Sequence, residues 1–186
     1  GGSGMRYWNS DSVIGQIDEL VKKYDVKNIK FIDEMFVLDK KHVNSIADKI
    51  IERRHDLNIW AYARVDTVND RALLEKMKKA GVNWLALGIE SGSKHVRDGV
   101  EKGRFGEDKI FANVQKIRDA GINIIGNYIF GLPDDTHETM QATLNLAKEL
   151  NCEWANFYSA MAYPGSALYG LARQKETPLP DDESVR

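Results

Sequence analysis

Hydrophobic and polar positions along this chain follow two periods, one typical of helices and the other typical of buried strands. The helical period begins after a Ser10–Asp11 cap, where an apolar stripe runs from Val13 to Val21. Short apolar runs such as N-I-W-A-Y-A-R (58–64) separate the helical segments and predict strands. The predicted helices are 10–24, 39–54, 70–79, 106–120 and 136–150. The predicted strands are 28–33, 58–64, 83–89, 122–130 and 153–158.

Two segments repeat one pattern. The first reads K-K-A-G-V-N-W-L-A-L-G-I-E-S-G-S (78–93) and the second reads R-D-A-G-I-N-I-I-G-N-Y-I-F-G-L-P (118–133). In each, a charged helix end meets glycine, which suits the left-handed residue that ends many helices. The apolar run that follows predicts a strand covered on both faces, and a polar loop comes after it.

The strict alternation of helices and strands predicts an α/β fold with a parallel sheet and right-handed crossovers. Five strands cannot close an eight-stranded barrel. We therefore expect a partial (β/α) barrel with a curved, open, mainly parallel sheet of about five strands. The first strand is expected to be missing, because the chain opens on a helix. A flat doubly wound sheet is the alternative, and both folds place ligands at the carboxyl ends of the strands.

Composition narrows the partners and the compartment. The 186 residues suffice for one domain with a core, and the net charge of -2 gives no reason to expect nucleic acid or a membrane surface. No apolar run approaches the ~18 residues of a membrane span. The single cysteine, Cys152, excludes an internal disulfide and indicates a reducing, cytoplasmic location. We expect a linker at 1–4, one domain at 5–170 and an irregular tail at 171–186.

Five segments carry a family resemblance. They are F-I-D-E-M-F (31–36), W-A-Y-A-R-V-D (60–66), L-G-I-E-S-G-S (87–93), N-Y-I-F-G-L-P-D (127–134) and A-Y-P-G-S-A-L-Y (162–169). In this order they resemble the core of a radical S-adenosylmethionine (SAM) enzyme, especially of the cobalamin-associated branch. The resemblance covers most of 5–169, and it implies a partial (β/α)6 barrel.

The resemblance also implies cofactors. Family members hold a [4Fe–4S] cluster on three cysteines in a C-x-x-x-C-x-x-C loop after the first strand, and thiolates suit such a cluster. That strand and loop are missing here, and Cys152 lies before the last strand. We therefore expect a piece of a larger enzyme whose partner is the missing upstream segment. The cluster would belong to the parent only, and SAM binding by this chain would be weak or absent.

The resemblance assigns cofactor-binding residues at the strand exits. Asp33 and Glu34 fall where the family contacts the amino end of methionine, although a solvated acidic pair is the alternative. Glu90 and Ser91 fall where the family binds ribose hydroxyls or the methionine end; a carboxylate and a hydroxyl both suit that task.

The remaining candidates lie on neighbouring strands. Asn127, Ile129 and Gly131 resemble the family segment near adenine, with a core strand and turn as the alternative, above all for Ile129. For Asn127 an interior polar group that faces the reaction chamber is a further alternative. Tyr158 and Ser159 fall where family members offer backbone contacts to adenine. Arg64 pairs internally with Asp66 or contacts substrate, and the sequence leaves both open. The four scattered histidines have no metal-ligand spacing, so no catalytic or metal-binding residue is assigned.

Three functions are compatible with these patterns. The leading one is a fragment of a radical SAM enzyme whose parent generates a 5′-deoxyadenosyl radical, for cobalamin-dependent methyl transfer or cyclisation. This chain would be inactive without the cluster loop. The second is a folding or oligomerisation module without catalysis, a homodimer formed through the sheet edge that the missing strand exposes. A barrel enzyme for a phosphorylated metabolite is the third, but it needs a phosphate cradle and a general base that the sequence does not show.

Overall fold

The computed structural model describes residues 6–33, 35–99, 106–177 and 179. Helices and strands alternate as the sequence predicts. The strands are β1 (Asn28–Lys30), β2 (Asn58–Arg64), β3 (Val82–Glu90), β4 (Asn123–Phe130) and β5 (Trp154–Ser159). The helices are α1 (Ser10–Tyr24), α2 (Lys40–Arg53), α3 (Arg71–Lys79), α4 (Lys94–Gly99), α5 (Glu107–Asp119), α6 (His137–Leu150) and α7 (Ala167–Gln174).

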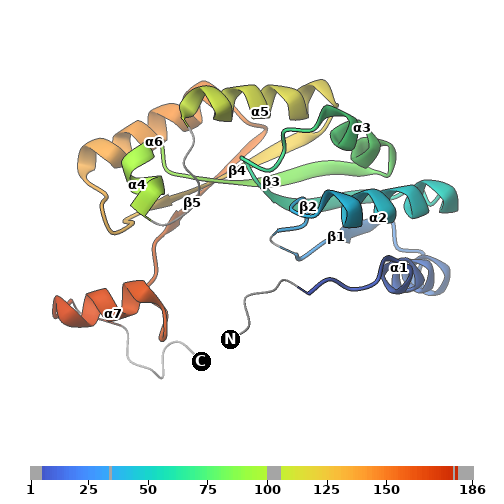
Figure 1. Cartoon of the computed structure of the whole chain (residues 1–186), viewed down its shortest axis with the longest axis horizontal. Coiled ribbons are helices and arrows are strands. Elements are labelled where there is room, and N and C mark those ends of the chain that lie inside the picture. Colours follow the sequence, from blue (N-terminus) through green and yellow to red (C-terminus); the bar gives the residue numbers. More distant parts are fainter. Residues whose placement is uncertain (1–5, 34, 100–105, 178, 180–186) are drawn as a thin grey trace.

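The described strands form one parallel sheet in the order β1-β2-β3-β4-β5. Each strand pairs with the next in the chain, so the sheet winds in one direction without the reversal of strand order found in a doubly wound fold. The sheet curls into an open half-barrel, with the main crossover helices on its outer side (Figure 1). The expected open partial barrel is confirmed.

The two faces of the sheet are unequally covered. In β2, Ile59, Ala61 and Ala63 are buried beneath helices, and the side chains that alternate with them are half-buried on the concave face. Strand β5 is largely exposed. Cover on both faces was expected for β3 and β4. It is wrong for β4, where buried and half-buried residues alternate because five strands leave the barrel open. In β3 the consecutive Leu85, Ala86 and Leu87 are all buried.

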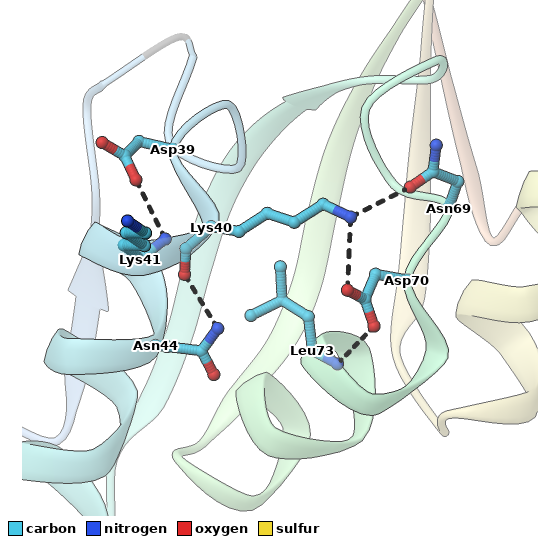
Figure 2. A network of polar contacts seen from close by, with 7 residues as sticks. All are labelled: Asp39, Lys40, Lys41, Asn44, Asn69, Asp70 and Leu73. Carbon is cyan, nitrogen blue, oxygen red and sulfur yellow. Dashed lines mark hydrogen bonds and ion pairs between the residues drawn. The ribbon is translucent and has the colours of Figure 1, made fainter.

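Side-chain caps fix the loops that leave β1 and β2. Asp39 accepts hydrogen bonds from the backbone N–H groups of Lys41 and His42 at the start of α2. Figure 2 shows how Lys40, at the start of α2, reaches the loop before α3. Its Nζ lies 3.2 Å from an Asp70 carboxylate oxygen. Asp70 in turn caps α3 by accepting from the Leu73 N–H. The two loops are thereby tied together at the carboxyl side of the sheet.

Two helices lie outside the predicted elements. Helix α4 (Lys94–Gly99) occupies part of the expected loop between β3 and α5. Helix α7 runs to Gln174, so the expected irregular tail from 171 is wrong for its first four residues. Ser166 caps α7 by accepting from the Tyr169 N–H, which explains why a helix begins there. None of the helices in the described ranges combines the length and apolar character needed to cross a membrane.

Candidate functional site

The carboxyl ends of β2, β3, β4 and β5 meet at one rim of the half-barrel. Strand pairing aligns Arg64 with Gly88, and Gly88 with Asn127. The next pair along, Phe130 and Ser159, ends β4 and β5 together. Candidates from segments far apart in the sequence therefore share a single edge, as the strand assignment predicted.

Glu90 ends β3 in an unusual conformation. Its φ is 69°, in the left-handed region that residues other than glycine seldom adopt, and the β3–β4 register shifts between Gly88 and Glu90. A Cβ built on Gly88 would lie 2.8 Å from Glu90 Oε1. The Glu90 side chain therefore folds back over Gly88, two residues earlier, and Gly88 leaves room for its carboxylate on the concave side.

Polar groups flank this carboxylate position on the adjacent strands. Arg64 makes two hydrogen bonds to Asp66, of 3.0 and 2.8 Å, so the structure shows the internal ion pair that the sequence left open. On β4, Asn127 Oδ1 accepts from Asn156 Nδ2 at 3.0 Å. The amide is thus held on the concave face beside Gly88.

Ser91 is placed differently from the other candidates. Its side chain is fully buried, and its hydroxyl lies 3.2 Å from that of Thr143 on α6. The Thr143 hydroxyl also accepts from the Gly92 N–H, and the Arg97 guanidinium donates to the Ser91 carbonyl. Ser91 therefore fixes the turn that follows Glu90, and its hydroxyl is already engaged within the protein.

Sequence reasoning missed the other members of this buried network. Arg97 is fully buried, and burial lowers the pKa of its guanidinium. A Cβ on Gly92 would lie 2.7 Å from the Ala142 backbone, so the loop and α6 approach too closely for any other residue. The one available signal was Thr143, a polar residue on the core-facing stripe of a predicted helix.

The turn after β4 is shaped by Asp135. Its Oδ2 accepts from the N–H groups of Gly131 and Leu132, at 2.9 and 3.0 Å. Gly131 has a φ of 80° and open space where a Cβ would lie. Its glycine is therefore required by the left-handed conformation, and it leaves the backbone accessible from solvent.

The last two strands supply a mixed surface next to that turn. Ile129 is half-buried and pairs with Tyr158, whose side chain is 52% exposed. Ser159 is exposed at the end of β5. These residues lie together at the rim, and their assignment to the adenine end stays a prediction.

Asp33 lies at the exit of β1. Its Oδ1 accepts from the Met35 N–H at 2.9 Å, so this carboxylate also shapes the turn. Phe31 and Phe36 stack beside it with ring centroids 4.7 Å apart. Glu34, its predicted companion, lies outside the described residues.

The residues of this chain do not fit a cluster held by three cysteines. The one cysteine, Cys152, precedes β5 and packs near Tyr128, and burial raises the pKa of its thiol to about 11. It is therefore protonated at neutral pH, whereas cluster ligands are thiolates. Within the described ranges, no three His, Cys, Asp or Glu side chains come together as a metal site.

Comparison with known proteins settles the family. A model described as the radical SAM superfamily matches residues 5–147. The chain belongs to the radical SAM superfamily. The sequence resemblance is thereby confirmed, and the half-barrel of this radical SAM chain is the expected fold.

Curated relatives include methyltransferases and a cyclase. The chain is 34% identical over 168 residues to "Uncharacterized methyltransferase PH0819" of Pyrococcus horikoshii, covering 89% of this chain and 36% of that protein. It is 31% identical over 160 residues to an anaerobic magnesium-protoporphyrin IX monomethyl ester cyclase of Rubrivivax gelatinosus, covering 84% and 28%. The chain thus spans about a third of the length of these relatives.

Solved structures share the fold at lower identity. The radical SAM methyltransferase TsrM from Kitasatospora setae, determined with cobalamin and a [4Fe–4S] cluster, gives a TM-score of 0.72 at 20% identity, covering 81% of this chain and 29% of its own. The cobalamin-dependent SAM radical enzyme OxsB gives 0.67 at 18% identity, covering 76% and 22%.

Proposed function

We propose that this chain forms the SAM-binding bowl of a radical SAM enzyme that carries out cobalamin-associated methyl transfer or cyclisation. The two relatives at 31–34% identity are named for these two reactions, which supports the choice. The observation that carries the proposal is the Glu90 carboxylate, which a left-handed backbone folds over Gly88 on the concave side of the sheet. Such strain is typical of functional positions.

Each candidate has a task that its surroundings allow. Glu90 accepts hydrogen bonds from ribose hydroxyls or from the methionine ammonium, and Asp33 with Glu34 balances that ammonium from the β1 side. Arg64, held by Asp66, places a positive charge near the rim. Ser91 acts as a positioning residue, because its turn sets the backbone that follows Glu90.

The adenosine end has its own partners in this proposal. Ile129 packs against adenine, and Asn127 presents an amide from the floor of the bowl. Gly131 lets the base approach the backbone, and Tyr158 and Ser159 offer main-chain groups. The cluster that would supply the electron for cleaving SAM is assigned to the parent enzyme, because the one cysteine of this chain cannot hold it.

The free edge of β1 is assigned to the rest of the parent. Among the described residues β1 pairs with β2 alone. A largely apolar groove of about 580 Å³ runs beside it, with Ile29, Phe31 and Phe36 in its lining. We assign the edge to an upstream strand of the parent, with a homodimer as the alternative. Light scattering of the isolated chain separates the two, since a monomer at high concentration contradicts the homodimer. The single cysteine supports a cytoplasmic setting.

Calorimetry of SAM binding tests the proposed site. We expect weak binding by the 186-residue chain, because the iron that anchors the amino and carboxylate groups is not supplied. Glu90→Gln should weaken it at least fivefold. Glu75→Gln, on the exposed surface of α3, is the matched control and should leave affinity unchanged. Equal affinities for all three proteins would contradict the assignment of Glu90.

A further inference from the structure

A second hollow lies on the concave face, toward the amino ends of the strands. It has a volume of about 410 Å³. Its lining is mostly aromatic and includes three of the four tryptophans of the chain. The residues that line it are Trp60, Trp84, Ile125, Trp154 and Asn156.

Strand register explains why residues so far apart in the sequence meet here. Trp60 pairs with Trp84 across β2 and β3, and Ile125 pairs with Trp154 across β4 and β5. Trp154 is 62% exposed, which is unusual for an indole on a strand. Three indoles, on β2, β3 and β5, thus face a space that the described part of the chain does not fill, and flat rings are suited to stack on them.

The polar groups of this tryptophan hollow are mostly occupied, with one exception. Trp154 Nε1 donates to Asn156 Oδ1 at 2.9 Å, and the Asn156 amide donates to Asn127. Trp60 Nε1 is buried and has no acceptor among the described residues. This nitrogen has almost no exposed surface, so it does not reach a molecule in the hollow, which offers its occupant aromatic faces rather than hydrogen bonds.

A positive charge lies beside one wall of the tryptophan hollow, on Lys30, which itself lines the groove next to β1. Lys30 Nζ is 4.1 Å from the ring centroid of Trp60 and 5.1 Å from that of Tyr62. Lys30 is exposed and makes no ion pair with a described residue. The ammonium is therefore available to an anionic group on a molecule that rests against the indoles.

We propose that the tryptophan hollow binds a planar conjugated carboxylate, with its rings against Trp84 and Trp154 and its carboxylate at Lys30. Trp60 precedes Arg64 by four residues, so the hollow lies about 13 Å below the rim. A ligand that stacks on the indoles of the hollow and also extends to the rim is a large flat molecule. Naming it as the substrate of the parent enzyme rests on the proposed function, whereas its binding does not.

Binding of 1-pyrenebutyrate, followed by pyrene emission anisotropy without SAM, tests this inference. The uncharged 1-pyrenebutanol is the reference probe. Trp154→Ala should weaken pyrenebutyrate binding about threefold to tenfold. Because Trp154 is exposed, the variant should keep its fold, and a urea unfolding midpoint equal to that of the wild type checks this. Trp8→Ala removes a 70% exposed tryptophan outside the hollow and should leave affinity unchanged.

The charge is tested separately. Lys30→Gln should reduce pyrenebutyrate affinity to that of pyrenebutanol and leave the alcohol unaffected. Equal losses in Trp154→Ala and Trp8→Ala, or equal affinities of the wild-type chain for the acid and the alcohol, would overturn the inference. SAM is absent from this assay, so a negative result with pyrenebutyrate would not affect the conclusion drawn from the SAM calorimetry of Glu90.

Discussion

The two faces of strand β3 differ in how deeply their side chains are buried. On the helix side, Leu85, Leu87 and Ile89 are fully buried. On the concave side, Trp84 and Glu90 are only half-buried, and Glu90 has a strained backbone. A strand alternates its side chains between two environments, so one sequence segment supplies both the core and the candidate site. The fully buried leucine and isoleucine side chains of β3 therefore lie on one face, and its candidate site residue lies on the other.

The largest expected effect comes from truncating the buried face. Leu87→Ala should lower the free energy of unfolding by about 2–5 kcal/mol, because it leaves a cavity under the helices. Tyr158→Ala, on the exposed strand β5, should cost less than about 1 kcal/mol. Urea unfolding followed by circular dichroism measures both. Similar losses in the two variants would show that the concave side is as well packed as the helix side.

The next effect concerns the turn after Glu90, where Gly92 packs against α6. Gly92→Val places side-chain atoms against the Ala142 backbone of α6 and should lower the free energy of unfolding by about 1–3 kcal/mol. It should also displace the turn after Glu90 and weaken SAM binding. Gly170→Ala is the control, since Gly170 lies in α7 with open space around it, and alanine there should be neutral or stabilising. An unchanged midpoint for Gly92→Val would refute the close approach.

Periodicity predicted the helix-covered face well because it depends on local pattern alone. The stripe through Val43, Ile46 and Ile50 indicated which side of α2 is buried, and the structure confirms it. Alternation also placed Glu90 directly after one predicted strand and Asn127 within the next, and parallel pairing brings Asn127 beside Gly88, two residues before Glu90. Local pattern and the topology rules suffice for these features.

Features that depend on contacts between distant segments could not be predicted this way. The hydroxyl of Ser91 is satisfied by Thr143, more than fifty residues later, and only the packing of α6 onto the β3 loop reveals it. The gathering of Trp60, Trp84 and Trp154 required the exact register of four strands. A shift of one residue would have turned each indole to the other face.

Replacing Glu90 separates its contribution to folding stability from its proposed contribution to SAM binding. Glu90→Gly removes the left-handed strain, so the free energy of unfolding should stay at or rise above that of the wild type, by up to about 1 kcal/mol. SAM binding should be lost. Glu75→Gly, in the exposed face of helix α3, is the matched control and should destabilise by about 1 kcal/mol. A destabilised Glu90→Gly would mean that this carboxylate serves the fold rather than the ligand.

The smallest effect concerns the ion pair of Lys40 with Asp70, which joins the loop after β1 to the loop after β2 (Figure 2). This ion pair is called the clamp below. The Leu73 N–H and then Lys40 lower the pKa of Asp70 from its usual 3.8. The clamp therefore contributes stability above the unfolded-state pKa and loses it as the pH falls through the lower folded-state value. Lys40→Met should lower the free energy of unfolding by about 0.2–1 kcal/mol at pH 7, and the difference should shrink under acid. Lys41→Met is the control, because the contact of Lys41 with Asp39 uses only its backbone N–H. A difference between Lys40→Met and the wild type that stayed constant from pH 7 into the acid range would exclude the Asp70 ion pair as its source.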